Sequence, residues 1–265
     1  MPLAAPGLWQ LALEARAPLE FAALIASMPW LARLPPGDGH PVVVFPGLGA
    51  SDLSTLPLRR FLSSLGYTAY AWRQGFNFGP RAGVLDGCRA ELKRVVDLHG
   101  VPVSLVGWSL GGIYARELAK ELGNQARCVI TLGTPFAGHP RSTNAWRFYQ
   151  MVSRQRVEGP ALAAQLKQVR KPPRCPTTSI YSRSDGVVAW RASLNTPASL
   201  TENIEVHASH IGMGLNPLAL LAVADRLAQD PAQWRPFDPQ GRYRRFYPFA
   251  RAADLASRPH SSAAA

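Results

Sequence analysis

The sequence predicts an α/β fold in which a doubly wound, mostly parallel sheet carries helices on both faces. Short apolar runs rich in β-branched residues alternate with segments of helical periodicity through most of the chain. The first run, Pro41 to Phe45, is apolar at every position, as expected for a strand that is buried on both faces. A G-x-S-x-G sequence, Gly107 to Gly111, stands between a later run and a helical segment.

The individual elements follow from the two periodicities. After the first strand, strands are expected at 67–72, 103–106, 128–132, 177–181 and 204–206, with helices near 58–65, 85–98, 113–122 and 217–227. In the helix over 113–122, the apolar face is predicted to hold Ile113, Leu118 and Leu122, and the polar face to include Arg116.

One domain with additions is expected from 265 residues of which 47% are hydrophobic. The core spans 39–230. Residues 1–38 are predicted to be an N-terminal helical segment packed on this core, because apolar residues recur there at helical intervals: Phe21, Leu24, Ile25 and Met28.

The regular alternation of strands and helices stops after His139. A small helical cap insertion is expected at about 139–172, with one helix over 144–156 and a second that begins at Pro160. Residues 231–265 form a basic and aromatic tail, and its end past Arg258 is expected to be disordered.

The chain is strongly basic, with a formal net charge of +12. Such a surface attracts polyanions, which leaves open a weak contact with an anionic membrane surface. The sequence has no zinc-finger, RNP-like or helix-turn-helix motif, so no nucleic-acid partner is expected.

A cytoplasmic location is predicted. No apolar run reaches the roughly 18 residues of a membrane-spanning helix, and the first residues lack the basic start of a secretory signal. The three cysteines, Cys88, Cys128 and Cys175, have no zinc-site spacing and suggest free thiols, so neither a metal nor a cofactor is expected.

Ser109, at the centre of the G-x-S-x-G sequence, is the candidate nucleophile. A glycine-rich turn with a chance serine would look the same locally, but the strand and helix on either side favour catalysis. A serine hydroxyl needs a neighbouring base, and the base needs an acid that orients it.

The base and the acid are sought in loops that follow strands. Asp185 and His210 each follow a predicted strand, whereas the carboxylates Asp86, Asp97 and Asp225 lie on predicted helix faces. His207 competes for the role of base; the loop position and the glycines that follow favour His210.

Five stretches carry a resemblance to a known family: VVVFPGLG, GWSLGG, LGTPFAG, SDGVV and SHIGM. On these motifs the chain resembles the α/β-hydrolase superfamily, and within it small bacterial lipases and esterases. The resemblance implies that the backbone N–H groups of Leu48 and Leu110 form the oxyanion hole. It also implies a shortened, six-stranded sheet. The chain departs from many relatives at Trp108, where they carry histidine.

The resemblance and the residues together predict cleavage of carboxylic esters with a hydrophobic acyl group through an acyl-enzyme on Ser109. Aromatic and apolar side chains are expected to line the substrate pocket: Trp108, Trp146, Phe148, Tyr149 and Met151. An acyltransferase or a thioesterase would use the same three residues. A lipid-surface or partner-binding module with a vestigial site is the alternative from another class.

Overall fold

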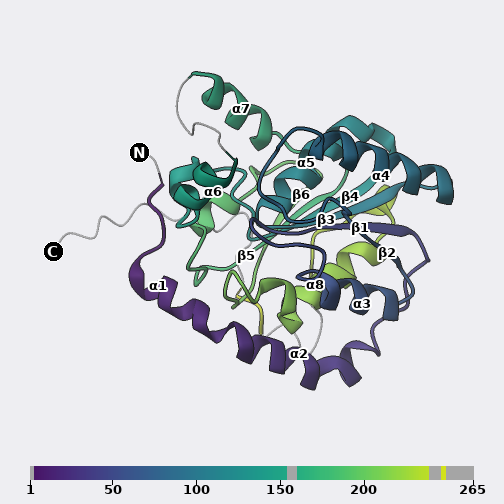
Figure 1. Ribbon diagram of the computed structural model, residues 1–265. Helices are drawn as coiled ribbons and strands as arrows, with labels where there is room; N and C mark the ends of the chain where they lie inside the picture. The colour runs from purple at the N-terminus through teal and green to yellow at the C-terminus, as the bar shows by residue number, and fades with distance from the viewer. Residues whose placement is uncertain (1–2, 154–159, 239–245, 249–265) are drawn as a thin grey trace.

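The computed structural model describes residues 3–153, 160–238 and 246–248 (Figure 1). Its centre is a six-stranded sheet in the order β2-β1-β3-β4-β5-β6, and every neighbouring pair is parallel. The predicted fold class is therefore confirmed. The strands are β1 Pro41–Phe45, β2 Thr68–Ala71, β3 Val103–Trp108, β4 Ala126–Leu132, β5 Thr177–Tyr181 and β6 Thr201–Glu205.

Helices cover both faces of the sheet, with a separate apolar core under each layer. One core joins α2, α3 and α8 to the sheet, and the other joins α4 and α5 to the opposite face (Figure 1). The alternating side chains of β1 divide between them: Val42 and Val44 enter the first core, and Val43 and Phe45 the second. These helices are α2 Ala17–Leu31, α3 Leu56–Ser64, α4 Val84–His99, α5 Leu110–Leu122 and α8 Pro217–Ala228.

The buried face of α5 differs from the predicted one. Tyr114, Ala115, Leu118 and Ala119 are buried, and so is Arg116, which the helical pattern places on the polar face. The Arg116 guanidinium donates to Asn195 Oδ1 at 2.9 Å and to the carbonyl of Arg170 at 3.2 Å, and it lies 3.8 Å from the centre of the Phe136 ring. The polar contacts and the aromatic face explain how this cation is accommodated in the interior.

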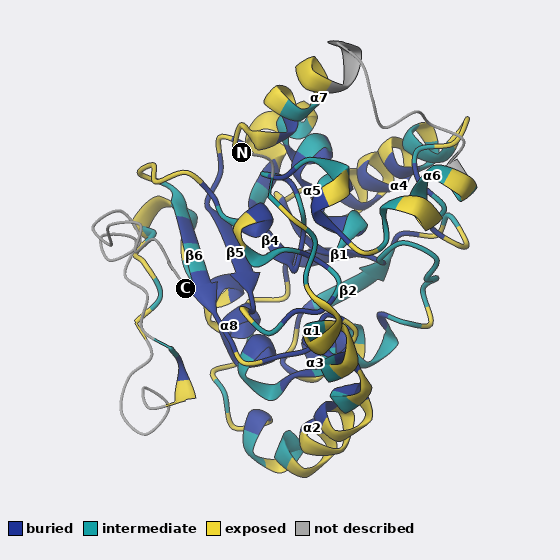
Figure 2. Cartoon of the chain, turned by 90° about the vertical axis from the view of Figure 1, so that its left-hand side faces the viewer, coloured by how far each residue is buried: buried dark blue, intermediate teal, exposed yellow. Residues whose placement is uncertain are grey.

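The N-terminal segment runs along the outside of the molecule through α1 Leu8–Ala12, a 3-10 helix Leu13–Arg16, and α2. Its apolar residues do not all face inward as predicted. Leu24 is buried in the core, whereas Phe21 and Ile25 are exposed. Figure 2 shows exposed residues along much of α2. Among the described helices, none combines the length and the apolar composition that a membrane crossing requires.

The region of the predicted cap holds two helices, α6 Trp146–Ser153 and α7 Pro160–Arg170, after a short 3-10 turn at Pro140–Ser142. Residues 154–156 of the predicted first helix lie outside the described residues. In the C-terminal region, a 3-10 turn spans Pro231–Gln233, and Tyr247 donates a hydrogen bond to the carbonyl of Leu218 at 2.7 Å. The predicted disordered end past Arg258 also lies outside the described residues.

Candidate active site

Ser109 stands at the turn between the central strand β3 and helix α5. Its backbone has φ 51° and ψ −123°, and Arg73 is the one other described non-glycine residue with positive φ. Such a conformation costs on the order of 1–3 kcal/mol and persists only where the surroundings hold it. Two backbone hydrogen bonds do so: Ser109 N–H donates to Leu132 O at 2.8 Å, and Gly112 N–H donates to Ser109 O at 3.0 Å.

The glycines around Ser109 allow α5 to pack directly on the strands. A Cβ atom at Gly107 would lie 2.3 Å from Cα of Gly112, and a Cβ at Gly111 would lie 2.3 Å from the Phe45 carbonyl oxygen. Both contacts are too short for any side chain, so the elbow requires glycine at these positions. The helix N-terminus therefore begins directly at Ser109, where its dipole favours negative charge.

His210 and Asp185 meet Ser109 at the carboxyl edge of the sheet, where the loops after β5 and β6 end. His210 Nε2 lies 2.9 Å from Ser109 Oγ, and His210 Nδ1 lies 2.7 Å from Asp185 Oδ2. The other carboxylate oxygen of Asp185 accepts hydrogen bonds from the N–H groups of Val187 at 2.8 Å and Val188 at 2.7 Å. His207 is exposed and has no side-chain contact with Ser109 within the described structure.

The protonation of His210 is set by opposing effects. Burial disfavours the imidazolium and lowers its pKa. The charge of Asp185 and its hydrogen bond act in the opposite direction, and the charge of Glu14 adds to them, so that the net pKa of His210 is raised above 6.5. The ring is therefore a stronger base than a free histidine.

The two predicted oxyanion donors belong to segments next to the serine, because Leu110 directly follows Ser109 and Leu48 directly follows Gly47. The loop after β1 approaches Ser109 so closely that a Cβ at Gly47 would lie 3.3 Å from Ser109 Cβ. In the described part of the chain, neither the Leu48 N–H nor the Leu110 N–H donates a hydrogen bond to another protein group. Both donors are thus free to receive a negatively charged oxygen.

Asn77, which holds this loop, was not among the residues that the sequence motifs singled out. The side chain is fully buried, and Nδ2 donates to the Pro46 carbonyl at 2.7 Å. The Asn77 backbone accepts from Gly49 N–H at 2.7 Å and donates to the Ala50 carbonyl at 2.8 Å. An asparagine between two phenylalanines and two glycines was the only signal available, and it indicates a turn as readily as a support.

The predicted substrate-binding residues differ in their surroundings. The Phe148 ring lies 3.1 Å from where a Cβ of Gly49 would stand, which brings it next to the loop that holds Leu48. Met151 is 68% exposed, and Trp146 contacts the guanidinium groups of Arg141 and Arg147. Burial raises the pKa of the Tyr114 phenol, and the nearby Tyr149 adds a smaller contribution in the same direction.

Trp108 is buried against the loop that carries His210. Its indole N–H donates to the His210 carbonyl at 3.0 Å, and its ring lies 2.7 Å from where a Cβ of Gly214 would stand. These contacts support the His210 loop from below. A contact between Trp108 and substrate stays a prediction.

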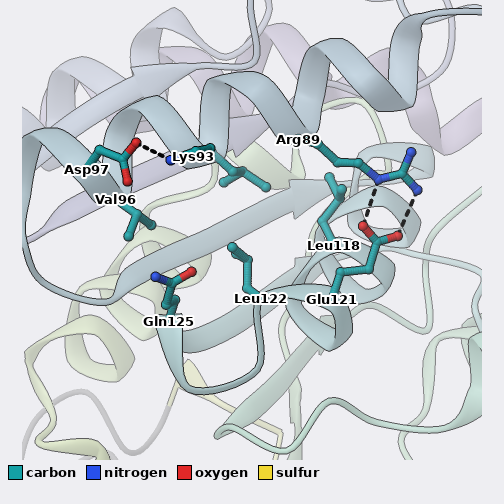
Figure 3. Close-up of a pocket in the computed structure, with 9 residues that line it drawn as sticks. Arg89, Lys93, Val96, Asp97, Leu118, Glu121, Leu122 and Gln125 are labelled. Atoms are coloured by element: carbon teal, nitrogen blue, oxygen red, sulfur yellow. Dashed lines mark hydrogen bonds and ion pairs between the residues drawn. The ribbon is translucent and has the colours of Figure 1, made fainter.

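A separate hollow lies between α4 and α5, away from Ser109 (Figure 3). Its charged side chains pair with one another: Arg89 with Glu121 at 2.8 Å and Lys93 with Asp97 at 2.5 Å. The two ion pairs neutralise the charges of these four side chains. Among the described residues, no group of three His, Cys, Asp or Glu side chains is arranged to hold a metal ion.

Two further buried residues near the site come from the N-terminal segment. Glu14 and Glu20 are 7% and 9% exposed, and their carboxylates contact the loops that carry Asp185 and His210. Sequence reasoning missed them, because periodicity predicts that charged residues of a surface helix face solvent. The available signal was their isolation in an otherwise apolar stretch.

Comparisons with known proteins agree with this fold. Several solved structures share the fold at low sequence identity. Aspergillus fumigatus lipase B is 16% identical with a TM-score of 0.55, over 74% of this chain and 55% of that one. A mature Bacillus licheniformis lipase is 16% identical with a TM-score of 0.55, over 74% and 95% of the two chains. A monoacylglycerol lipase from Paleococcus ferrophilus is 14% identical with a TM-score of 0.54, over 73% and 95%.

This chain therefore spans little more than half of the Aspergillus lipase and nearly all of the other two. A search among curated proteins found no match. Residues 42–262, most of the sequence, match the model of the alpha/beta hydrolase family. The chain belongs to the alpha/beta hydrolase family.

Proposed function

We propose that the protein is a serine hydrolase that cleaves carboxylic esters with a hydrophobic acyl group through an acyl-enzyme on Ser109. The observation that carries the proposal is the hydrogen-bonded chain from Ser109 Oγ through His210 to Asp185 at the start of α5. Two free backbone donors beside it add support, because acyl transfer needs both an activated nucleophile and a site for the oxyanion.

In the proposed reaction, Ser109 Oγ attacks the ester carbonyl carbon while His210 Nε2 accepts the hydroxyl proton. Asp185 keeps the ring oriented and stabilises the imidazolium. The carbonyl oxygen becomes negative and accepts hydrogen bonds from the Leu48 and Leu110 N–H groups. His210 then gives its proton to the leaving alcohol, and the acyl-enzyme forms. Water, deprotonated by His210, attacks the carbonyl carbon of this intermediate; as the bond to Ser109 Oγ breaks, His210 returns the proton to Oγ and the carboxylic acid is released.

The preference for a hydrophobic acyl group rests on the side chains of α6. Phe148 is 41% exposed and lies next to the loop that holds Leu48, so its ring is available to an acyl chain that leaves Ser109 in that direction. The same three residues would serve a thioesterase or an acyltransferase. For this reason the test includes thioesters, and alcohol acceptors beside water.

The proposal is tested with an alkyl phosphonate probe, followed by peptide mass spectrometry, and with a panel of esters and thioesters, each with water and with an added alcohol as acceptor. The probe should modify Ser109, and Ser109→Ala should lose both the label and turnover. Removal of such a nucleophile costs on the order of 10⁶ in kcat. Ser63→Ala, at an exposed serine of α3, is the matched control and should keep both. Labelling of another serine, or turnover by folded Ser109→Ala, would contradict the proposal.

A further inference from the structure

Two carboxylates of the N-terminal segment are buried, while several of its apolar side chains are exposed. Between residues 3 and 32 the charged residues are Glu14, Arg16 and Glu20. Glu14 and Glu20 are buried, whereas Leu8 and Trp9 on α1 are 86% and 76% exposed (Figure 2). The charged side chains of a surface helix ordinarily face water, and a buried carboxylate is costly without hydrogen-bond partners. The partners of Glu14 and Glu20 therefore show what these residues hold in place.

Glu14 joins the loop of the acid to the loop of the base. Its Oε1 accepts hydrogen bonds from the backbone N–H of Gly186 at 2.7 Å and of His210 at 2.9 Å, and Oε2 accepts from Ile211 N–H at 2.9 Å. Gly186 directly follows Asp185. One carboxylate thus binds the backbone on both sides of the Asp185–His210 contact, through charge-assisted hydrogen bonds.

Glu20 and Arg16 extend the same connection by one residue on each loop. Glu20 accepts from the N–H and the Oγ–H of Ser209, both at 2.7 Å. Arg16 donates to Glu20 Oε1 at 3.1 Å and to Ser184 Oγ at 2.7 Å. Ser209 precedes His210 and Ser184 precedes Asp185. With the contacts of Glu14 to Gly186 and Ile211, the segment therefore binds the residues on both sides of Asp185 and of His210.

The N-terminal segment packs closely against the loops that carry Asp185 and His210. A Cβ at Gly186 would lie 2.2 Å from the Gln10 carbonyl oxygen, and a Cβ at Gly212 would lie 1.6 Å from Glu20 Oε2. The loop of Asp185 therefore needs glycine at 186, where it meets the backbone of the segment, and a side chain at 212 would have to displace the Glu20 carboxylate. A buried carboxylate is costly unless its hydrogen bonds are satisfied, and the three backbone donors around Glu14 satisfy that condition.

We propose that Glu14 is a positioning residue of the active site, which aligns His210 between Asp185 and Ser109 by binding the backbone of both loops. The inference rests on the proposed function of these three residues and makes the N-terminal segment a working part of the site. Glu14 acts through His210 and touches neither Ser109 nor the reacting atoms. Its negative charge also stabilises the imidazolium that forms during acyl transfer.

The charged groups that face His210 are few. Asp185 contacts the ring from the loop after β5, and Glu14 contacts the His210 backbone from the N-terminal segment; Glu20 and Arg16 pair with each other at the adjoining Ser209. Loss of the Glu14 charge should therefore lower the pKa of His210 while Asp185 keeps it bound.

The test compares Glu14→Gln with Glu202→Gln. Glu202 is a matched control: it is 9% exposed and also accepts a backbone hydrogen bond, from Phe237 N–H at 2.7 Å, but it lies on β6, where its carboxylate pairs with Arg226 of α8, away from Ser109. Glu14→Gln should lower kcat by about 10–100-fold, since a misplacement of about 1 Å can cost 10²-fold. Its activity should also begin at lower pH. Glu202→Gln should change neither.

An NMR titration of the His210 ring supplies a readout that needs no turnover, and it should show the lowered pKa in Glu14→Gln alone. If Glu14→Gln does not fold, Glu14→Asp replaces it: the charge stays, so the pH profile should hold while the shorter side chain lowers kcat. Wild-type kcat and ring pKa in the folded variant tested would overturn the inference. Failure of the wild-type protein to be labelled at Ser109 would instead refute the proposed function, and the titration would still decide the role of Glu14.

Discussion

Replacement of Asn77 by alanine tests whether the loop after β1 must be held for catalysis. The change removes the donor to the Pro46 carbonyl, a 2.7 Å bond in the interior, and the acceptor for Gly79 N–H at 3.2 Å. A buried polar group left without a partner costs about 1–3 kcal/mol, so the free energy of unfolding should fall by at least that amount. The backbone hydrogen bonds of residue 77 can still form.

The effect on turnover follows from the place of Leu48, which lies between Pro46, bound by the Asn77 side chain, and Gly49, bound by the Asn77 backbone. Loss of a whole oxyanion donor costs about 10²–10³ in kcat. A loosened Leu48 N–H should cost part of this, about 10–100-fold. KM should hardly change, because the oxyanion exists only in the transition state.

The measurement is kcat and KM on a short aryl ester, together with urea unfolding. Asn195→Ala is the matched control, since Asn195 is also buried and donates from Nδ2 to a backbone carbonyl, that of Glu202 at 3.0 Å, but lies away from the serine. It should lose stability and keep kcat. If Asn77→Ala behaves like Asn195→Ala, with lower stability and unchanged kcat, the assignment of Asn77 as support of the oxyanion loop is wrong.

Three further outcomes are expected. His210→Ala should lose nearly as much activity as the serine variant because the two residues act as a unit, while the exposed His207→Ala should keep most of it; the reverse result would reassign the base. Because the pKa of His210 is raised and the base must be neutral, kcat/KM should increase with pH through a midpoint above 6.5, measured at constant ionic strength; a midpoint below that value would contradict the balance of charges described here. Over an ester series, kcat/KM should rise with acyl length by at most about 0.8 kcal/mol per methylene, and Trp146→Ala with Phe148→Ala should flatten this rise; an unchanged profile would exclude α6 as the acyl site.

The fold and the arrangement of the site could be predicted because both depend on short, local patterns. The apolar run at 41–45 and the strand-to-helix turn at Ser109 each indicate a parallel sheet without reference to distant residues. In such a sheet the carboxyl ends of all strands lie along one edge. The order of the loops that carry Ser109, Asp185 and His210 therefore suffices to bring those residues together.

The supports of the site could not be predicted because they depend on contacts between distant parts of the chain. Glu14 and His210 are separated by 196 positions. The periodicity of the N-terminal segment also argued against such a contact, since Phe21 and Ile25 were expected inside and are exposed. The prediction that Arg116 faces solvent was wrong for a related reason. The Asn195 and Phe136 side chains that accommodate it come from other loops.

The two halves of the site are held in different ways. The strained backbone of Ser109 is fixed by the Leu132 carbonyl of the neighbouring strand β4 and by glycines that let α5 meet β3. The loops of Asp185 and His210 contain no described non-glycine residue of positive φ, and they are bound to each other through Glu14. A change in the N-terminal segment should therefore disturb the base while the elbow of Ser109 keeps its shape. The segment can therefore affect proton transfer without contacting Ser109, because that transfer depends on the orientation of the His210 ring.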